Sequence, residues 1–123
     1  MHISVDSFYD HTVIPIVVIG TGGNGAHLIQ RLASANEALI RLGYAGIQVV
    51  AIDGDTVEDP NIGRQPFHDG QLKQMKCRAI IESVNMAYGY YWKYIPTMYT
   101  KETYSILYRD FSYQNGIAIT CVD

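Results

Sequence analysis

An apolar run that leads directly into a glycine-rich loop limits this chain to few folds. Residues 12–19 read Thr-Val-Ile-Pro-Ile-Val-Val-Ile, which is typical of a strand buried on both faces of a parallel sheet. The loop Gly20-Thr-Gly-Gly-Asn-Gly25 follows, and apolar positions at helical spacing continue from Asn24 to Leu42, with Gly43 as a stop signal. The sequence therefore predicts a strand, a tight glycine turn and a helix in direct succession.

Strand and helix patterns alternate along the rest of the chain. We expect a strand at 47–52, a helix at 72–87, an aromatic β-prone stretch at 90–99, a short helix at 101–111 and a buried strand at 117–122. Such alternation implies a parallel sheet with right-handed crossovers. The predicted fold class is a doubly wound, Rossmann-like α/β fold with helices on both faces, in which ligands lie at the carboxyl ends of the strands.

Length and composition exclude several classes of protein. The chain has 123 residues, 48% of them hydrophobic and 17% charged, which fits a single globular domain with no separate substrate domain. The apolar run is far shorter than the ~20 residues of a membrane span. Neither Lys nor Arg precedes Arg31, so the sequence lacks the positively charged start of a signal peptide, and we expect a cytoplasmic protein without membrane association.

The net charge and the cysteines exclude further classes of function. The formal net charge is -3, which argues against a surface that neutralises nucleic-acid phosphates. The two cysteines, Cys77 and Cys121, form no C-x-x-C pair, so neither a zinc knuckle nor a redox dithiol is expected. We expect both thiols in the core.

The glycine loop is the first candidate site. It satisfies G-x-G-x-x-G between a strand and a helix. Glycines there permit a tight turn and let backbone N–H groups approach a phosphate, while the helix start adds partial positive charge. Close packing of the strand on the helix, without a ligand, is the alternative explanation.

Polar residues follow the second expected strand. Asp53 ends that strand, where a carboxylate accepts hydrogen bonds from ribose hydroxyls of a mononucleotide or a dinucleotide. The segment 53–70 is long for a connection inside a compact domain, and its Asn61 and Arg64 carry donors suited to phosphate oxygens. The alternatives are a solvated acid at the strand end and a surface ion pair of Arg64.

Lys76 is the third candidate. At about 100° per residue it falls on the apolar side of the helix expected at 72–87, close to the N-terminal end. The helix dipole disfavours a cation there unless an anion is close. Lys73 falls at the border of this apolar side, and Arg78 falls outside it. We interpret both as charged residues that make the helix surface soluble. A stem lying on apolar surface with its ammonium in water is the alternative for Lys76.

Four motifs together resemble a known superfamily. The glycine loop, Asp53-Gly-Asp55-Thr-Val, Asn61-Ile-Gly-Arg64-Gln65 and Lys76 are similar in order and spacing to the ThiF type of the ubiquitin-activating-enzyme-like superfamily. Among its branches, the chain looks most like the ThiF-type proteins of bacterial PRTRC gene cassettes. The resemblance extends over about residues 14–123, and D-x-D-x-V followed by N-x-x-R-Q is its most specific part.

The resemblance implies a reaction and a set of roles. Members of the family bind ATP with magnesium and adenylate the C-terminal carboxylate of a small ubiquitin-like or sulfur-carrier-like protein. By resemblance, Arg64 and Lys76 have catalytic roles, Asp53 contacts the ribose, and Asp123 binds magnesium. The positions implied for nucleotide binding are Gly20, Gly22, Gly23, Gly25, Asp53, Asp55, Asn61, Arg64, Gln65 and Lys76.

The resemblance also implies that the family domain continues past Asp123. We therefore expect residues 1–123 to be the N-terminal part of a larger adenylation domain, with an incomplete sheet, and to be inactive alone. A strand order of 3-2-1-4 would leave 117–122 at an edge, which favours homodimerisation or association through that edge. The alternatives are an NAD(P)-binding domain of an oxidoreductase, which has no need of Arg64 and Lys76, and a non-catalytic fragment that only binds a partner.

Overall fold

The computed structural model describes residues 12–110 and 116–121 of the chain. Strands and helices alternate in the order expected, and two short 3-10 turns lie in the long connection. The elements are β1 (Ile14–Ile19), α2 (Gly23–Arg41), β2 (Ile47–Ile52), η1 (Asp59–Asn61), η2 (Asp69–Gln71), α3 (Lys76–Tyr88), β3 (Lys93–Ile95), α4 (Lys101–Asp110) and β4 (Ile117–Thr120).

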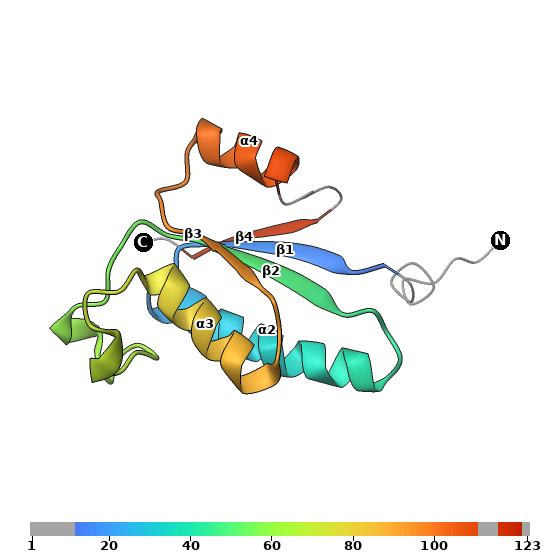
Figure 1. Ribbon diagram of the computed structural model, residues 1–123, viewed down its shortest axis with the longest axis horizontal. Coiled ribbons are helices and arrows are strands. Elements are labelled where there is room, and N and C mark those ends of the chain that lie inside the picture. The colour runs from blue at the N-terminus through green and yellow to red at the C-terminus, as the bar shows by residue number, and fades with distance from the viewer. Residues whose placement is uncertain (1–11, 111–115, 122–123) are drawn as a thin grey trace.

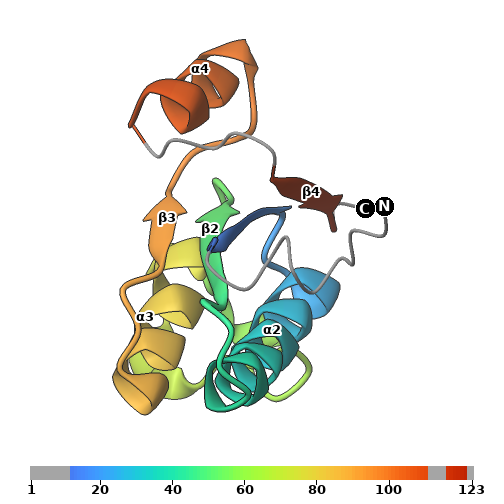
Figure 2. The same ribbon diagram turned by 90° about the vertical axis from the view of Figure 1, so that its right-hand side faces the viewer.

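The strands form one parallel sheet in the order β3-β2-β1-β4. Helices α2 and α3 lie side by side against one face, and α4 lies over the other (Figures 1 and 2). This arrangement confirms the predicted doubly wound α/β class. Because every strand is parallel, the ends of β1 and β2 meet at the same edge of the sheet, where Ile19 is in register with Ile52.

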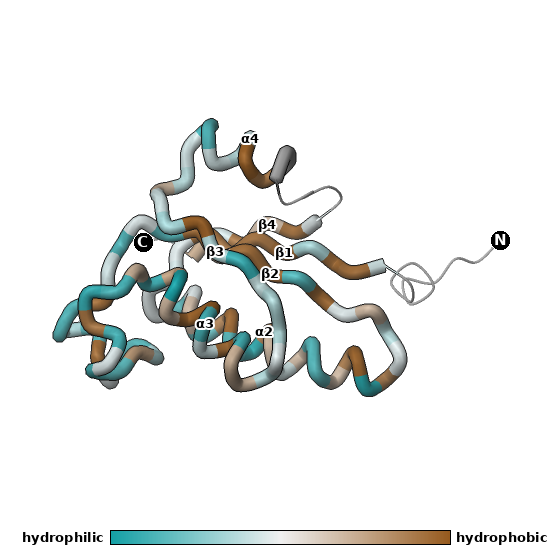
Figure 3. Tube along the Cα trace, viewed as in Figure 1, coloured by the Kyte–Doolittle hydropathy of each residue, from teal (hydrophilic) through white to brown (hydrophobic). Residues whose placement is uncertain are grey.

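Alternating side chains of the central strands divide the core into two parts. Ile16 and Val18 of β1 pack with α2 and α3, whereas Val17 and Ile19 pack with Ile95 and α4. The central strands accordingly form the most hydrophobic stretch of the trace (Figure 3). Burial on both faces explains why the sequence of β1 is a continuous apolar run rather than an alternating one.

Helix α3 begins at Lys76, so the expected start at residue 72 was wrong. The residues before it pair with the long connection instead: Thr56 forms an antiparallel bridge with Met75, and the Val57 N–H donates to the Gln74 carbonyl at 2.8 Å. Lys73 also adopts a left-handed φ of 68°, which a helix cannot contain. Further along, α3 contacts both the sheet and α2, which explains the burial of Ile81 and Val84 outside the expected apolar side.

Two burial expectations near the C-terminal end were wrong. We expected a buried strand, but three of the four residues of β4 are exposed, because β4 pairs only with β1 and no described helix covers it (Figure 2). Of the two thiols expected in the core, Cys77 is buried, whereas Cys121 is only partly buried and packs against the edge of the core. No helix in the described residues is long and apolar enough to cross a membrane.

Candidate functional site

The glycine loop makes a tight crossing between β1 and α2. Gly20 has a φ of 93°, and its N–H donates to the Ile52 carbonyl at 2.8 Å. A Cβ on Gly25 would lie 1.8 Å from the Gly20 carbonyl oxygen, so no side chain fits there. Close strand–helix packing therefore accounts for Gly20 and Gly25 without a ligand.

Gly22 and Gly23 have a different environment. A Cβ on either would meet only the Gln65 side chain, at 3.6 Å or more, which is ordinary van der Waals distance. Helix α2 begins here with no side-chain cap and no acidic residue in its first turn. Its first N–H groups therefore remain available to an anion.

Asp53 joins the ends of the two central strands. Its Oδ2 accepts hydrogen bonds from the Thr21 backbone N–H at 2.7 Å and the Thr21 hydroxyl at 2.8 Å. Its Oδ1 accepts the Asp55 N–H at 2.9 Å, and the residue is only 8% exposed. A carboxylate has about four acceptor positions, so Asp53 keeps one for a ligand while it holds the glycine loop in place.

Lys76 is the first residue of α3 and lies at the same edge. It is only 9% exposed, and it forms no ion pair with any described residue. Its N–H donates to the Asp55 carbonyl at 2.9 Å, and the first turn of α3 carries no acidic residue and no side-chain cap. A second helix start and a buried cation thus meet the start of α2, beside the carboxylates of Asp53 and Asp55.

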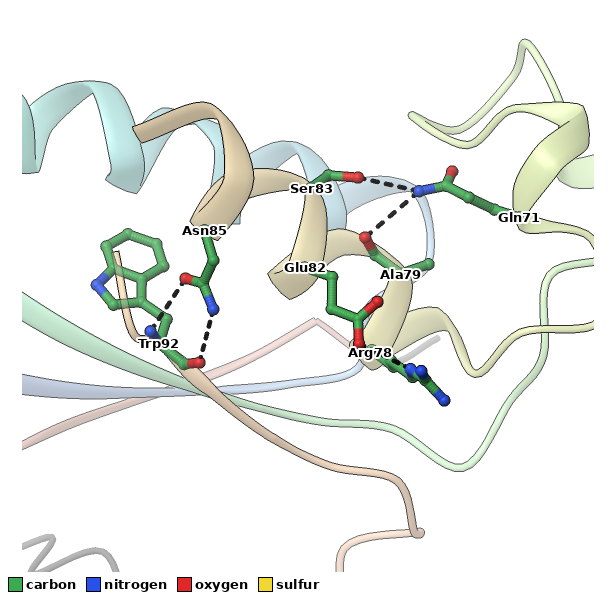
Figure 4. A network of polar contacts seen from close by, with 7 residues as sticks. All are labelled: Gln71, Arg78, Ala79, Glu82, Ser83, Asn85 and Trp92. Carbon is green, nitrogen blue, oxygen red and sulfur yellow. Dashed lines mark hydrogen bonds and ion pairs between the residues drawn. The ribbon is translucent and has the colours of Figure 1, made fainter. Parts of the chain in front are cut away.

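The basic residues on either side of Lys76 in the sequence, Lys73 and Arg78, are already paired. Lys73 Nζ lies 2.6 Å from Glu58 Oε2 and Arg78 Nε lies 2.8 Å from Glu82 Oε1, all in exposed positions. Figure 4 shows the Arg78–Glu82 pair on α3. This agrees with the interpretation of Lys73 and Arg78 as solubilising and distinguishes them from Lys76.

The same helix also anchors the long connection. Figure 4 shows Gln71 Nε2 donating to the Ser83 hydroxyl at 3.0 Å and to the Ala79 carbonyl at 3.3 Å. These bonds tie η2 to α3. The connection that follows Asp53 is therefore an ordered wall of the site.

Two adjoining cavities lie at this edge and share Gly20, Asp53 and Met98. The apolar cavity has a volume of about 290 Å³, and the polar cavity about 270 Å³. The apolar one is completed by Ile19, Ile52, Tyr99 and Thr120. The polar one is completed by Gly22, Gly23, Asn24, Asp55, Gln65, Lys76 and Cys121.

Three expected site residues do not line the polar cavity, and a fourth lies outside the described residues. Gly25 is buried in the strand–helix crossing. Asn61 is buried, and its Oδ1 accepts the Glu58 N–H at 2.8 Å, so it caps η1. Arg64 is exposed, lines neither cavity and forms no ion pair with a described residue. Asp123 lies outside the described residues.

The structure adds residues that sequence reasoning missed. Thr21 is fully buried and holds Asp53, although it occupies a variable position of the glycine motif. Met98 comes from the loop after β3, and a Cβ on Gly54 would lie 2.7 Å from its Sδ. Residue 54 is a glycine because Met98 leaves no space for a side chain there. The two residues are far apart in the chain, so no local pattern could have identified Met98.

The two thiols provide a test of this geometry. Burial is the main cause that raises the pKa of Cys77, to about 11, and burial also raises the pKa of Cys121. Because the thiolate is the reactive form, alkylation of both should be slow at pH 8 and still accelerate above pH 9. We expect Cys121, which lines the polar cavity, to react first and Cys77 only on unfolding. Mass spectrometry of the alkylated chain checks this order, and faster reaction of Cys77 would contradict it.

Comparison with known proteins confirms the resemblance to ThiF-type ubiquitin-activating-like proteins. The chain is 34% identical over 71 residues to the adenylyltransferase and sulfurtransferase UBA4 of Eremothecium gossypii, a match that covers 57% of this chain and 14% of the relative. It is 38% identical over 69 residues to the UBA4 of Yarrowia lipolytica, covering 56% and 15%. The chain therefore spans only about a seventh of the length of these curated relatives. No family model matches the chain.

The fold has a counterpart among solved structures. The tRNA N6-threonylcarbamoyladenosine dehydratase TcdA of E. coli superposes with a TM-score of 0.61 at 22% identity. The superposition covers 89% of this chain and 42% of TcdA. At this identity the likeness concerns the fold.

Proposed function

We propose that this chain binds ATP with magnesium as part of an adenylyltransferase that activates the C-terminal carboxylate of a ubiquitin-like or sulfur-carrier-like protein. One observation carries the proposal: two uncapped helix starts and the buried, unpaired Lys76 meet at one polar cavity. The names of the curated relatives, which are adenylyltransferases and sulfurtransferases, support the same class of reaction.

The residues present fit a nucleotide. Gly22 and Gly23 form a surface without side chains beside free N–H groups, which suits phosphate oxygens. The adjoining apolar cavity contains Tyr99 and Met98 and would hold the base. Asp53 lies between the two cavities, where its remaining acceptor position would meet the ribose.

The other expected binding residues enter the proposal in different ways. Asp55 lines the polar cavity and is exposed, so its carboxylate is accessible from the nucleotide site. Asn61 keeps its amide N–H₂ group as a donor, since only its oxygen caps η1. Arg64 would have to turn from solvent towards the phosphates. Asp123 is proposed as a magnesium ligand.

The chemistry requires no general base, because a carboxylate is already a nucleophile at neutral pH. In the proposed step, a carboxylate oxygen attacks the α-phosphorus of ATP, the bond between the α- and β-phosphates breaks, and pyrophosphate leaves. The contribution of the protein is then to position the phosphates and to neutralise charge that develops in the transition state. Lys76 is suited to this role, since its ammonium group forms no ion pair with a described residue.

The partners and the location are part of the proposal. A small ubiquitin-like protein would be the acceptor. The open edge of β4, with Ile117 46% exposed, favours pairing with a second copy, because unpaired backbone groups on an apolar edge strand attract another strand. A cytoplasmic location remains our expectation.

Calorimetric titration with ATP and with NAD tests the proposal. We expect ATP with magnesium to bind more tightly than NAD, because the polar cavity places Lys76 and two helix starts where a triphosphate is neutralised. Tighter binding of NAD, independent of magnesium, would support the oxidoreductase alternative. Binding of neither ligand would support a fragment that only contacts a partner protein.

A further inference from the structure

Gln65 lies over the part of the glycine loop that would receive a phosphate. Its Nε2 is 3.6 Å from the Cβ position of Gly22, and its Cγ is 3.8 Å from that of Gly23. The side chain comes from the long connection, whereas both glycines belong to the start of α2. Gln65 therefore contacts the loop from across the polar cavity.

The amide of Gln65 is held there by contact alone. Its Oε1 is the one buried side-chain oxygen or nitrogen in the described part of the chain that lacks a hydrogen-bond partner. A buried acceptor without a donor is less stable than the same acceptor in water, because it has lost its hydrogen bonds to water. The missing partner weakens the covered position of the side chain, so that a bound anion can displace the amide at a low cost in free energy.

In contrast to its side chain, the backbone of Gln65 is held by hydrogen bonds. Its N–H donates to the Asn61 carbonyl at 2.8 Å, and its carbonyl accepts the Phe67 N–H at 2.7 Å. Phe67 is buried in the core cluster that also contains residues of α3. A movement at this position therefore involves the side chain and leaves the wall of the cavity in place.

An anion that binds the first N–H groups of α2 needs the space next to Gly22 and Gly23. Because the Gln65 amide occupies part of that space, the anion and the amide compete. We propose that Gln65 is a displaceable cover of the anion site: it lies over Gly22 and Gly23 without ligand and rotates away when a polyphosphate binds. The inference rests on the proposed function in that the displacing group is a phosphate chain.

The inference predicts the direction in which removal of the Gln65 side chain changes the affinity for a polyphosphate. When the uncovered state is populated to about a tenth, the apparent dissociation constant is about tenfold higher than the intrinsic one. Gln65→Ala removes the cover and leaves the backbone contacts unchanged. A residue that only contacts phosphate would have the opposite effect, since its removal weakens binding.

The experiment is calorimetric titration of the wild-type chain and of Gln65→Ala with ATP–Mg and, separately, with inorganic tripolyphosphate. We expect Gln65→Ala to bind both probes about tenfold more tightly and to retain the wild-type melting temperature. Gln74→Ala is the matched control, because Gln74 belongs to the same connection and lines neither cavity. It should bind both probes like the wild type.

The outcomes separate this inference from the proposed function. Weaker or unchanged binding of both probes by Gln65→Ala would show that Gln65 does not cover the anion site, even when ATP binds the wild type as proposed. Tighter binding of tripolyphosphate without any binding of ATP supports the cover and contradicts the proposed nucleotide. If neither the wild-type chain nor Gln65→Ala binds either probe, both the inference about Gln65 and the proposed function are overturned.

Discussion

Lys76→Ala is expected to lower the rate of ATP–pyrophosphate exchange about 100- to 1000-fold, equivalent to about 2.7–4 kcal/mol of transition-state stabilisation. Lys76 is buried at the start of α3 and has no acidic partner among the described residues. Its ammonium is therefore free to meet negative charge that grows on the phosphates. The affinity for ATP should fall less than the rate, because this charge is largest in the transition state. The assay requires a form of the protein that catalyses exchange.

Lys73→Ala is the matched control for this variant. Lys73 lies three residues earlier but is exposed and paired with Glu58, so its loss should leave exchange unchanged. Equal losses of affinity and rate in Lys76→Ala would instead show a residue that binds only the ground state. Arg64→Ala belongs in the same series. A rate loss similar to that of Lys76→Ala would show that the exposed Arg64 side chain turns towards the phosphates during the reaction.

Gly25→Ala is expected to destabilise the fold by about 3 kcal/mol or more, at the upper end of overpacking substitutions. The added Cβ would lie 1.8 Å from the Gly20 carbonyl oxygen and 3.3 Å from the Cβ of Cys121. Relief of the first contact requires α2 to move away from the end of β1. Thermal unfolding should show a melting temperature lower by about 10 °C or more for a domain of this size.

Gly23→Ala is the control that separates folding from binding. Its Cβ would meet only Gln65 atoms, at 3.8 Å and 3.9 Å, so its stability should stay within about 0.5 kcal/mol of wild type. The added methyl group would nevertheless stand where a phosphate approaches the loop, and ATP binding should weaken. A Gly25→Ala chain that melts like Gly23→Ala would contradict the packing role of Gly25.

The sequence by itself determined the fold class and the edge of the sheet at which the site lies. The apolar run of β1, the glycine loop and the β-branched stretch of β2 are local patterns, and local patterns are set by backbone sterics and by burial on two faces. Since parallel strands end at one edge, the residues after β1 and β2 had to meet. Asp53 and the glycine loop were therefore predictable as neighbours, whereas the sequence placed Lys76 on the apolar side of its helix and left open whether its ammonium reaches water.

Only the tertiary structure decided what each of these residues does at that edge. Asp53 uses most of its acceptors on Thr21 and Asp55, and Asn61 uses its oxygen to cap a turn. The start of α3 at Lys76 depends on the pairing of residues 56–57 with residues 73–75. Hydrogen bonds and contacts between segments far apart in the chain leave no periodic trace in the sequence. For the same reason, the position of Met98 and the unpartnered Gln65 oxygen could be found only after the chain had folded.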